Sequence, residues 1–201
     1  KVITAHCPNS GSMMGLLDKG NKAWFSFSDN PKRKLKYTLE IIEVKKNMVG
    51  TNTFLSNKIV HEALNEKRIN KLIKFSNIRN EVKFTDNTRF DFLISNNKEK
   101  IFLEVKNVTL SRNKGFAEFP DAKTERGKKH LIKLVEAQKK GFDSYIIYLI
   151  QRNDCKNFEI AHDIDPEYKK AHDYAKKNNV KILCYDCQIS SQEVKLNKRI
   201  L

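Results

Sequence analysis

The hydrophobic positions of this chain group into short strand-like runs over roughly its first quarter. Residues 22–27 (KAWFSF) and 36–44 (KYTLEIIEV) are rich in aromatic and β-branched side chains, which is typical of strands. Ser-Asp-Asn-Pro at 28–31 separates them and is a strong turn signal. The pattern predicts a small β domain over residues 1–53, with a boundary near Gly50.

Beyond that boundary, the pattern changes to alternating helical and strand-like segments. Residues 56–69 predict a helix that Ser56 would cap at its N-terminus. Its apolar stripe consists of Ile59, Val60, Ala63 and Leu64. Three strand-like runs follow, at 80–85, 89–94 and 100–105.

The rest of the chain predicts two helix–strand pairs. Residues 123–140 form an amphipathic helix, with Asp121 or Thr124 as its cap and Gly141 as its stop. The run SYIIYLI at 144–150 is apolar throughout, as in a strand covered on both faces. A second helix starts at Pro166 and continues to Lys177, and a buried strand follows at 180–185.

This order of elements defines the expected fold class. From residue 54 to 201 it reads α-β-β-β-α-β and then α-β. Three consecutive strands followed by alternating units predict an α/β domain with a mixed sheet and flanking helices. Together with the β domain, the whole chain is α+β.

The candidate catalytic residues lie between Arg89 and Lys106, where the segments RFDFLI and KIFLEVK are joined by a polar turn. Alternate residues of a strand face the same way, so Glu104 and Lys106 share a face. A hairpin would bring Asp91 beside Glu104. These two carboxylates, the backbone carbonyl of Val105 and water are the oxygen ligands that Mg²⁺ or Mn²⁺ prefers.

In this interpretation Asp91, Glu104 and Lys106 are the catalytic residues of a metal-dependent nuclease. The metal would polarise the scissile phosphate and activate a water, and Lys106 would position that water or stabilise developing charge. Glu62 and Glu81 are further candidate ligands. A chance Glu-x-Lys in a lysine-rich chain is the alternative, although carboxylates within apolar strands need a partner or a metal.

The charge of the chain favours a polyanionic partner. Its 39 Lys and Arg against 24 Asp and Glu give a net charge of +15, spread over both predicted domains. Nucleic acid is the first candidate and an anionic membrane surface the second. Genome bias can also produce a composition rich in Lys, Asn and Ile, so charge alone does not identify DNA.

Two basic clusters are candidate nucleic-acid contacts. One follows the turn in the β domain and consists of Lys32, Arg33, Lys34 and Lys36. It would lie beside aromatic strands, as in barrels that bind single strands. The other opens the helix after residue 123 and consists of Arg126, Lys128, Lys129 and His130, where a helix N-terminus favours phosphate. A solvated hairpin and a solvated basic helix are the alternatives.

The remaining composition points to a cytoplasmic protein that does not bind membranes. No apolar run approaches the roughly 20 residues that span a bilayer, and no signal peptide is visible. Four cysteines are too few for a disulfide scaffold in a chain of this length. The chain starts at Lys1 without methionine, so this expectation does not extend to residues upstream.

Several segments, in their order, resemble the sugar fermentation stimulation protein A (SfsA) family and cover nearly the whole chain. They are HCPNSGSMMG at 6–15, WFSFSDNPKRK at 24–34, NTF at 52–54, EVK at 81–83, RFDF at 89–92, EVKNVTL at 104–110 and the run 119–131. Two positions depart from the usual pattern. Ser10 stands where the family usually has threonine. Phe90 precedes Asp91, at the position where the PD-(D/E)xK nuclease motif has proline.

The resemblance implies an N-terminal OB-like β-barrel domain and a C-terminal PD-(D/E)xK restriction-endonuclease-like domain. Family members begin earlier, so the first strands of the barrel are expected to lie outside this sequence. The family's carboxylates and lysine map onto Asp91, Glu104 and Lys106.

The Asp91, Glu104 and Lys106 set and the positive charge favour Mg²⁺- or Mn²⁺-dependent cleavage of duplex or structured DNA, although the resemblance alone establishes no substrate. Two alternatives stay open. One is a non-enzymatic DNA-binding transcriptional regulator linked to sugar metabolism, and the other is an RNA-binding protein. The oligomeric state is also open, a homodimer included.

Overall fold

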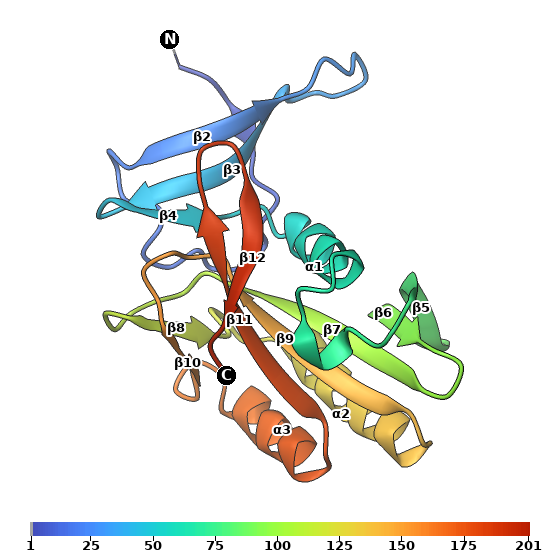
Figure 1. Cartoon of the computed structure of the whole chain (residues 1–201). Coiled ribbons are helices and arrows are strands. Elements are labelled where there is room, and N and C mark those ends of the chain that lie inside the picture. Colours follow the sequence, from blue (N-terminus) through green and yellow to red (C-terminus); the bar gives the residue numbers. More distant parts are fainter. Residues whose placement is uncertain (1) are drawn as a thin grey trace.

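The computed structural model describes residues 2–201, which form an N-terminal β sheet above a larger α/β domain (Figure 1). The N-terminal sheet contains β1 (Ala5–His6), β2 (Lys22–Phe27), β3 (Tyr37–Val44) and β4 (Asn47–Gly50). Strand β3 pairs with all three others, in parallel with β1 and antiparallel to β2 and β4. Met13, Leu16, Ile42 and Val49 form its small core.

The larger domain contains a six-stranded mixed sheet in the order β12-β11-β9-β7-β6-β5. Its helices are α1 (Leu55–Asn65), α2 (Glu125–Lys139) and α3 (Pro166–Lys177), with a 3-10 turn at Asn70–Leu72. The strands of this sheet are β5 (Asn77–Thr85), β6 (Thr88–Ser95), β7 (Lys100–Val108), β9 (Asp143–Ile150), β11 (Lys181–Ile189) and β12 (Val194–Arg199). A separate two-stranded sheet pairs β8 (Phe116–Phe119) with β10 (Asn157–Ile160). The predicted mixed sheet is confirmed.

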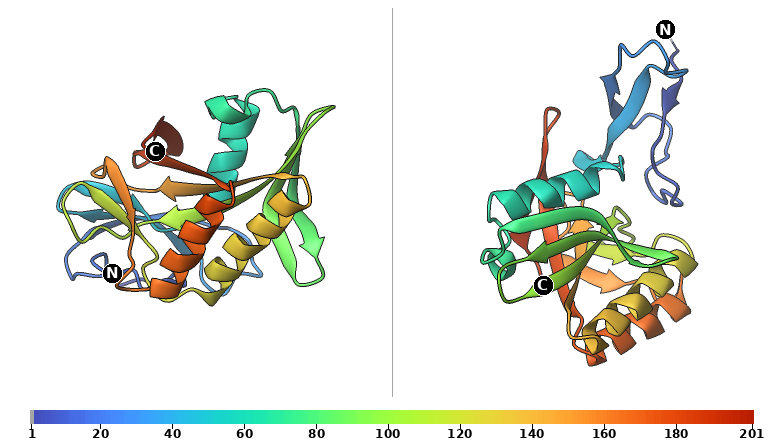
Figure 2. Two further views of the ribbon diagram at one scale, coloured as in Figure 1. Left: turned by 90° about the horizontal axis from the view of Figure 1, so that it is seen from below. Right: turned by 90° about the vertical axis from the view of Figure 1, so that its right-hand side faces the viewer.

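Helix α1 covers one face of the large sheet, while α2 and α3 cover the other (Figure 2). Strand β9 shows why its sequence is apolar throughout. Ile147 and Leu149 pack in the core on the α1 side, and Ile146, Tyr148 and Ile150 pack in the core on the α2 and α3 side. Both faces are buried, as predicted.

The start of α1 differs from the prediction. Phe54 occupies the N-cap position without a side-chain hydrogen bond, and the helix ends at Asn65. Ser56 lies inside the helix and is buried, where its hydroxyl accepts a hydrogen bond from Gln151 Nε2 at 3.1 Å. Asn52 turns the chain instead, because its Oδ1 accepts from the Phe54 amide at 3.1 Å. Thr124 caps α2 through the Gly127 amide, as one of the two predicted options.

The sequence interpretation missed the strands β4, β8, β10 and β12. Strands β4, β8 and β10 have only four residues each, too few for a periodic signal. Strand β12 (VKLNKR) is a polar edge strand that resembles a loop in composition. Across residues 2–201, no helix is both long and apolar enough to cross a membrane.

Gly50 joins β4 tightly to the larger domain. Its amide donates to the Gln151 carbonyl at 2.9 Å, and a Cβ at Gly50 would lie 2.3 Å from Gln151 Oε1. The Gln151 side chain is fully buried and its Nε2 donates to Asn107 Oδ1 at 2.6 Å, so it has no free space to move into. We expect Gly50→Ala to lower the free energy of unfolding by about 1–3 kcal/mol through overpacking. Urea denaturation measures this, and an unchanged midpoint would contradict the tight contact.

Candidate functional site

Three carboxylates from neighbouring strands come to the same level of the large sheet. The β5–β6 register pairs Asn80 with Phe92 and Val82 with Phe90, and the position between these pairs places Glu81 opposite Asp91. The β6–β7 ladder ends at the pair Phe92–Leu103, and the next position of the same register places Asp91 opposite Glu104. The structure therefore brings the predicted carboxylate pair together across two adjacent strands.

At this level both β5 and β6 reverse the face that they present to the core. Ile78 packs on the α1 side and Val82 on the α2 side, although an even spacing should keep them on one face. Phe92 and Phe90 of β6 differ in the same way. Glu81 has φ +51, and this left-handed backbone turns the strand over. Strain stored beside a cluster of polar groups is common at functional sites.

The carboxylate of Asp91 points along the sheet toward β7. Its Oδ2 accepts from the Val105 amide at 2.7 Å, and its Oδ1 accepts from Asn57 Nδ2 at 2.8 Å. The N–H and C=O of one strand residue point to the same side, so the Val105 carbonyl also faces the gap where the β6–β7 ladder has ended. Burial, and then the charge of Glu104, raise the pKa of Asp91 to about 6.

Glu104 is almost completely buried, with 2% of its surface exposed. Its Oε1 accepts from Lys106 Nζ at 2.6 Å and contacts His130 Nδ1. Burial raises the pKa of Glu104, but Lys106 and His130 outweigh it, so the pKa lies below its usual value. Its Oε2 is buried without a hydrogen-bond partner, and an ionised oxygen in that state is costly.

These groups fit a divalent cation that prefers oxygen. The orphaned Oε2 of Glu104, the Asp91 carboxylate and the Val105 carbonyl supply oxygen ligands only, which suits Mg²⁺, Mn²⁺ or Ca²⁺ rather than Zn²⁺. Within residues 2–201, no group of three His, Cys, Asp or Glu side chains converges as a complete metal cluster. The three oxygen ligands from Glu104, Asp91 and Val105 therefore match an ion that keeps several of its waters.

Of the two further candidate ligands, the structure places only Glu81 at this site. Glu81 lines the cleft around Asp91. Glu62, the other alternative, lies away from the site, because its carboxylate pairs with Arg68 at 2.9 Å and does not line the cleft. Helical rotation is the reason, since α1 turns Asn57 and His61 toward the cleft and Glu62 away from it.

The cleft has a volume of about 490 Å³ and opens between α1, the sheet and the start of α2. Its polar walls include Asn57, His61, Asn107 and Arg126. The sequence interpretation missed Asn57, the donor that holds Asp91. The only signal for it was its position just after the NTF stretch at 52–54, at the domain boundary.

The basic cluster of α2 divides into different roles. Arg126 is exposed and lines the cleft. Lys128 pairs with Glu125 at 2.8 Å, and Lys129 donates to the Asn87 carbonyl at 3.2 Å. The prediction for His130 as a nucleic-acid contact is wrong: it is 7% exposed and lies against Glu104, because the buried stripe of α2 includes this position.

The basic cluster of the N-terminal domain does not line the cleft around Asp91. Arg33 donates to Thr38 Oγ1 and Lys36 to the Asn30 carbonyl, both at 2.7 Å, so these two order the loop. Lys32 and Lys34 are exposed. Their location leaves them free to contact a ligand outside the cleft.

Comparisons with known proteins agree with this architecture. Residues 54–193 match the family model described as the sugar fermentation stimulation protein RE domain, and residues 1–51 match the SfsA N-terminal OB domain. A sugar fermentation stimulation protein homolog from Pelagibacter ubique is 54% identical, over 100% of this chain and 86% of its own length. The homolog from Caulobacter vibrioides is 42% identical, over 99% of this chain and 84% of its own length.

A solved structure has the same fold. Pyrococcus furiosus SfsA, determined in complex with Ca²⁺, matches with a TM-score of 0.90 at 21% identity, covering 99% of this chain and 85% of that chain. With its N-terminal OB domain and its C-terminal mixed sheet with flanking helices, this chain belongs to the sugar fermentation stimulation protein (SfsA) family.

Proposed function

We propose that this protein hydrolyses DNA phosphodiesters with the help of Mg²⁺ or Mn²⁺. The observation that carries the proposal is the buried, unpaired Oε2 of Glu104 beside Asp91 and Lys106. The related Pyrococcus furiosus protein was determined with Ca²⁺, an ion that also takes oxygen ligands. A divalent ion held by Glu104 and Asp91 in this protein would satisfy the orphaned oxygen.

Each residue of the site has a definite task in this proposal. Asp91, Glu104 and the Val105 carbonyl would hold the ion, which supplies polarisation of the phosphate and a more acidic water. Lys106 places a cation beside the site, where negative charge develops on the phosphate. Asn57 and His130 fix the orientations of Asp91 and Glu104 through their direct contacts.

The distribution of charge supports DNA as the substrate. The chain carries a net charge of +15, and the exposed Arg126 stands at the cleft. Lys32 and Lys34 add exposed positive charge on the N-terminal domain. Contacts of this kind neutralise phosphates and make binding weaken as salt increases.

A cleavage assay with metal controls tests the proposal. Plasmid and branched DNA are incubated with the protein in Mg²⁺, Mn²⁺ or EDTA, and we expect cleavage with either metal and none in EDTA. Calorimetric titration with Mn²⁺ is run in parallel. DNA binding without metal binding or cleavage would favour a non-enzymatic DNA-binding regulator, and preferential binding of single-stranded RNA over DNA would favour an RNA-directed protein.

Metal affinity is expected to depend on pH through Asp91. Its carboxyl has a pKa of about 6 in the metal-free protein, raised from 3.8, so it is ionised above that pH and protonated below it. Protons compete with the metal below pH 6, and we expect Mn²⁺ affinity to fall about tenfold per pH unit there. Calorimetry across this range measures the effect.

Two variants serve as controls for the pH experiment. Asp91→Asn removes the titrating ligand and should bind Mn²⁺ weakly at every pH. Glu62→Gln changes a carboxylate that lies away from the cleft and should keep the wild-type profile. A wild-type affinity that stays constant across pH 6 would exclude Asp91 as a ligand.

A further inference from the structure

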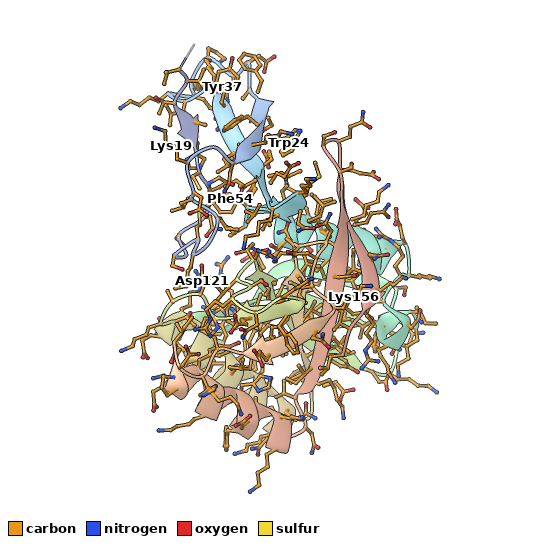
Figure 3. The ribbon with its side chains drawn as sticks, turned by 90° about the vertical axis from the view of Figure 1, so that its left-hand side faces the viewer. Lys19, Trp24, Tyr37, Phe54, Asp121 and Lys156 are labelled. Atoms are coloured by element: carbon orange, nitrogen blue, oxygen red, sulfur yellow. The ribbon has the colours of Figure 1, made fainter. Side chains whose placement is uncertain are left out.

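Phe54 is an exposed aromatic residue at the wall of the cleft. Its side chain is 70% exposed, and it lines the same cleft as Asp91 and Lys106. It lies at the junction between the two domains (Figure 3). An aromatic ring held in water beside a polar site gains free energy when a flat partner covers it.

The backbone around Phe54 is held in place by several hydrogen bonds. The Phe54 amide donates to Asn52 Oδ1 at 3.1 Å, and the Leu55 amide donates to the Asn52 carbonyl at 3.1 Å. Thr53 Oγ1 donates to the Pro8 carbonyl at 2.7 Å. The ring therefore projects from an ordered turn, and little backbone entropy is lost when a ligand stacks on it.

A second cleft borders the first at Lys106. This second cleft has a volume of about 380 Å³ and lies between the N-terminal loop at 9–11 and the segment 118–127. The two clefts share four residues, which line both of them. They are Thr53, Lys106, Asn107 and Arg126. A chain of phosphates could follow this path past Lys106 and Arg126.

Contacts between the domains border the second cleft. Ser12 Oγ donates to the Asp121 carbonyl at 2.7 Å, and the Met13 amide donates to Asp121 Oδ2 at 3.2 Å. Gly11 approaches so closely that a Cβ there would lie 2.4 Å from Asp121 Oδ2. Asp121 lies below the N-terminal loop in Figure 3. The two domains are thus tied together beside the path of the substrate.

The sizes of the two clefts indicate what can enter. Volumes of about 490 and 380 Å³ fall in the range of sites for small organic ligands. A nucleotide has this size, whereas a base-paired duplex is far wider than such a space. An unpaired nucleotide therefore matches the space beside Asp91.

We propose that the DNA strand to be cut passes through these two clefts unpaired, with one base stacked on Phe54 and a neighbouring phosphate bound by Arg126. The substrate class is then single-stranded DNA, or a single-stranded segment of branched DNA. This inference rests on the proposed function for the identity of the reacting bond, but the stacking contact is a binding property that can be measured without cleavage.

Binding experiments with the full chain test the stacking contact. A fluorescent single-stranded oligonucleotide and its duplex are titrated with protein in Ca²⁺, the ion present with the related structure. We expect the single strand to bind more tightly. Loss of one base–aromatic stack should weaken single-strand binding about 5- to 150-fold in Phe54→Ala, while Phe54→Trp should bind like the wild type.

A matched control and a spectroscopic signal separate stacking from general effects. Phe116 of β8 is 38% exposed and lines neither cleft, so Phe116→Ala should bind like the wild type. An oligonucleotide containing 2-aminopurine should be quenched by the wild type and by Phe54→Trp, but not by Phe54→Ala. Retained folding of each variant is verified by its unfolding midpoint.

Two results of the binding experiments would overturn the inference. One is duplex binding as tight as single-strand binding, and the other is unchanged single-strand affinity in Phe54→Ala. Tight, Phe54-dependent binding of single strands without cleavage in Mg²⁺ or Mn²⁺ would refute the proposed hydrolysis and leave this inference standing. Metal-dependent cleavage of uninterrupted duplex by Phe54→Ala at the wild-type rate would refute this inference alone.

Discussion

Glu104→Gln should reduce metal-dependent DNA cleavage by about 10³-fold, the upper range for loss of one electrostatic contact to a reacting group. The substitution keeps the shape of the side chain and removes its charge. The buried Oε2 has no protein partner, so the amide would present either a neutral oxygen or an N–H to the place where a cation must bind. Initial rates of cleavage of branched DNA in Mn²⁺ measure the loss, and calorimetry should show weakened Mn²⁺ binding.

A second substitution at the site separates metal binding from chemistry. Lys106→Met should also reduce the rate of cleavage, yet it removes no oxygen ligand and should leave Mn²⁺ binding intact. Glu62→Gln is the matched carboxylate control, because Glu62 pairs with Arg68 away from the cleft. Equal cleavage by the wild type, Glu104→Gln and Lys106→Met would mean that the activity arises elsewhere.

Arg112→Met is expected to destabilise the fold by roughly 3 kcal/mol at neutral pH, because it leaves a buried carboxylate without its cation. Arg112 Nη2 donates to Glu118 Oε1 at 2.6 Å and to Asp163 Oδ1 at 2.8 Å. Glu118 is only 2% exposed, whereas Arg112 is one-third exposed, which places the effect at the lower end for buried pairs. Urea denaturation at several pH values measures the loss.

The effect of Arg112→Met should disappear in acid. The guanidinium of Arg112 holds the pKa of Glu118 below its usual value of 4.5, so this ion pair contributes stability above that pH and loses it as pH falls through the lowered pKa. The difference in the free energy of unfolding between wild type and variant should therefore be largest above about pH 5 and should shrink below pH 4. The double variant Arg112→Met/Glu118→Gln should recover part of the stability, since no buried charge remains. A difference that is constant with pH would contradict this account.

The positions of the major helices and strands follow from local sequence signals. Pro166 and Gly141 mark helix ends by fixed backbone preferences, and the structure confirms both. The run SYIIYLI predicted a strand buried on both faces because no polar residue interrupts it. The sequence did not predict short strands such as β8 and β10, because four residues carry too little periodic signal and these strands pair with segments far away in the chain.

The candidate site depended on the sequence for its residues and on the structure for their environment. Asp91, Glu104 and Lys106 were identified from spacing and from the resemblance to a family. Alternation could not show that β5 reverses its face at Glu81, because this reversal depends on one left-handed φ angle. It also could not show that Glu62 turns away from the cleft, which depends on the angle at which α1 docks.

The sequence by itself determined the order of the major helices and strands, the EVK pattern and the excess of positive charge, since these depend on residue type and spacing along the chain. Only the tertiary structure decided which polar groups lose water and which partners they then meet. Burial leaves Glu104 Oε2 unpaired and places His130 against Glu104. The N-terminal loop contacts Asp121, and this contact borders the second cleft beside Lys106. These contacts join residues far apart in the chain, so their energies have no counterpart in any local pattern.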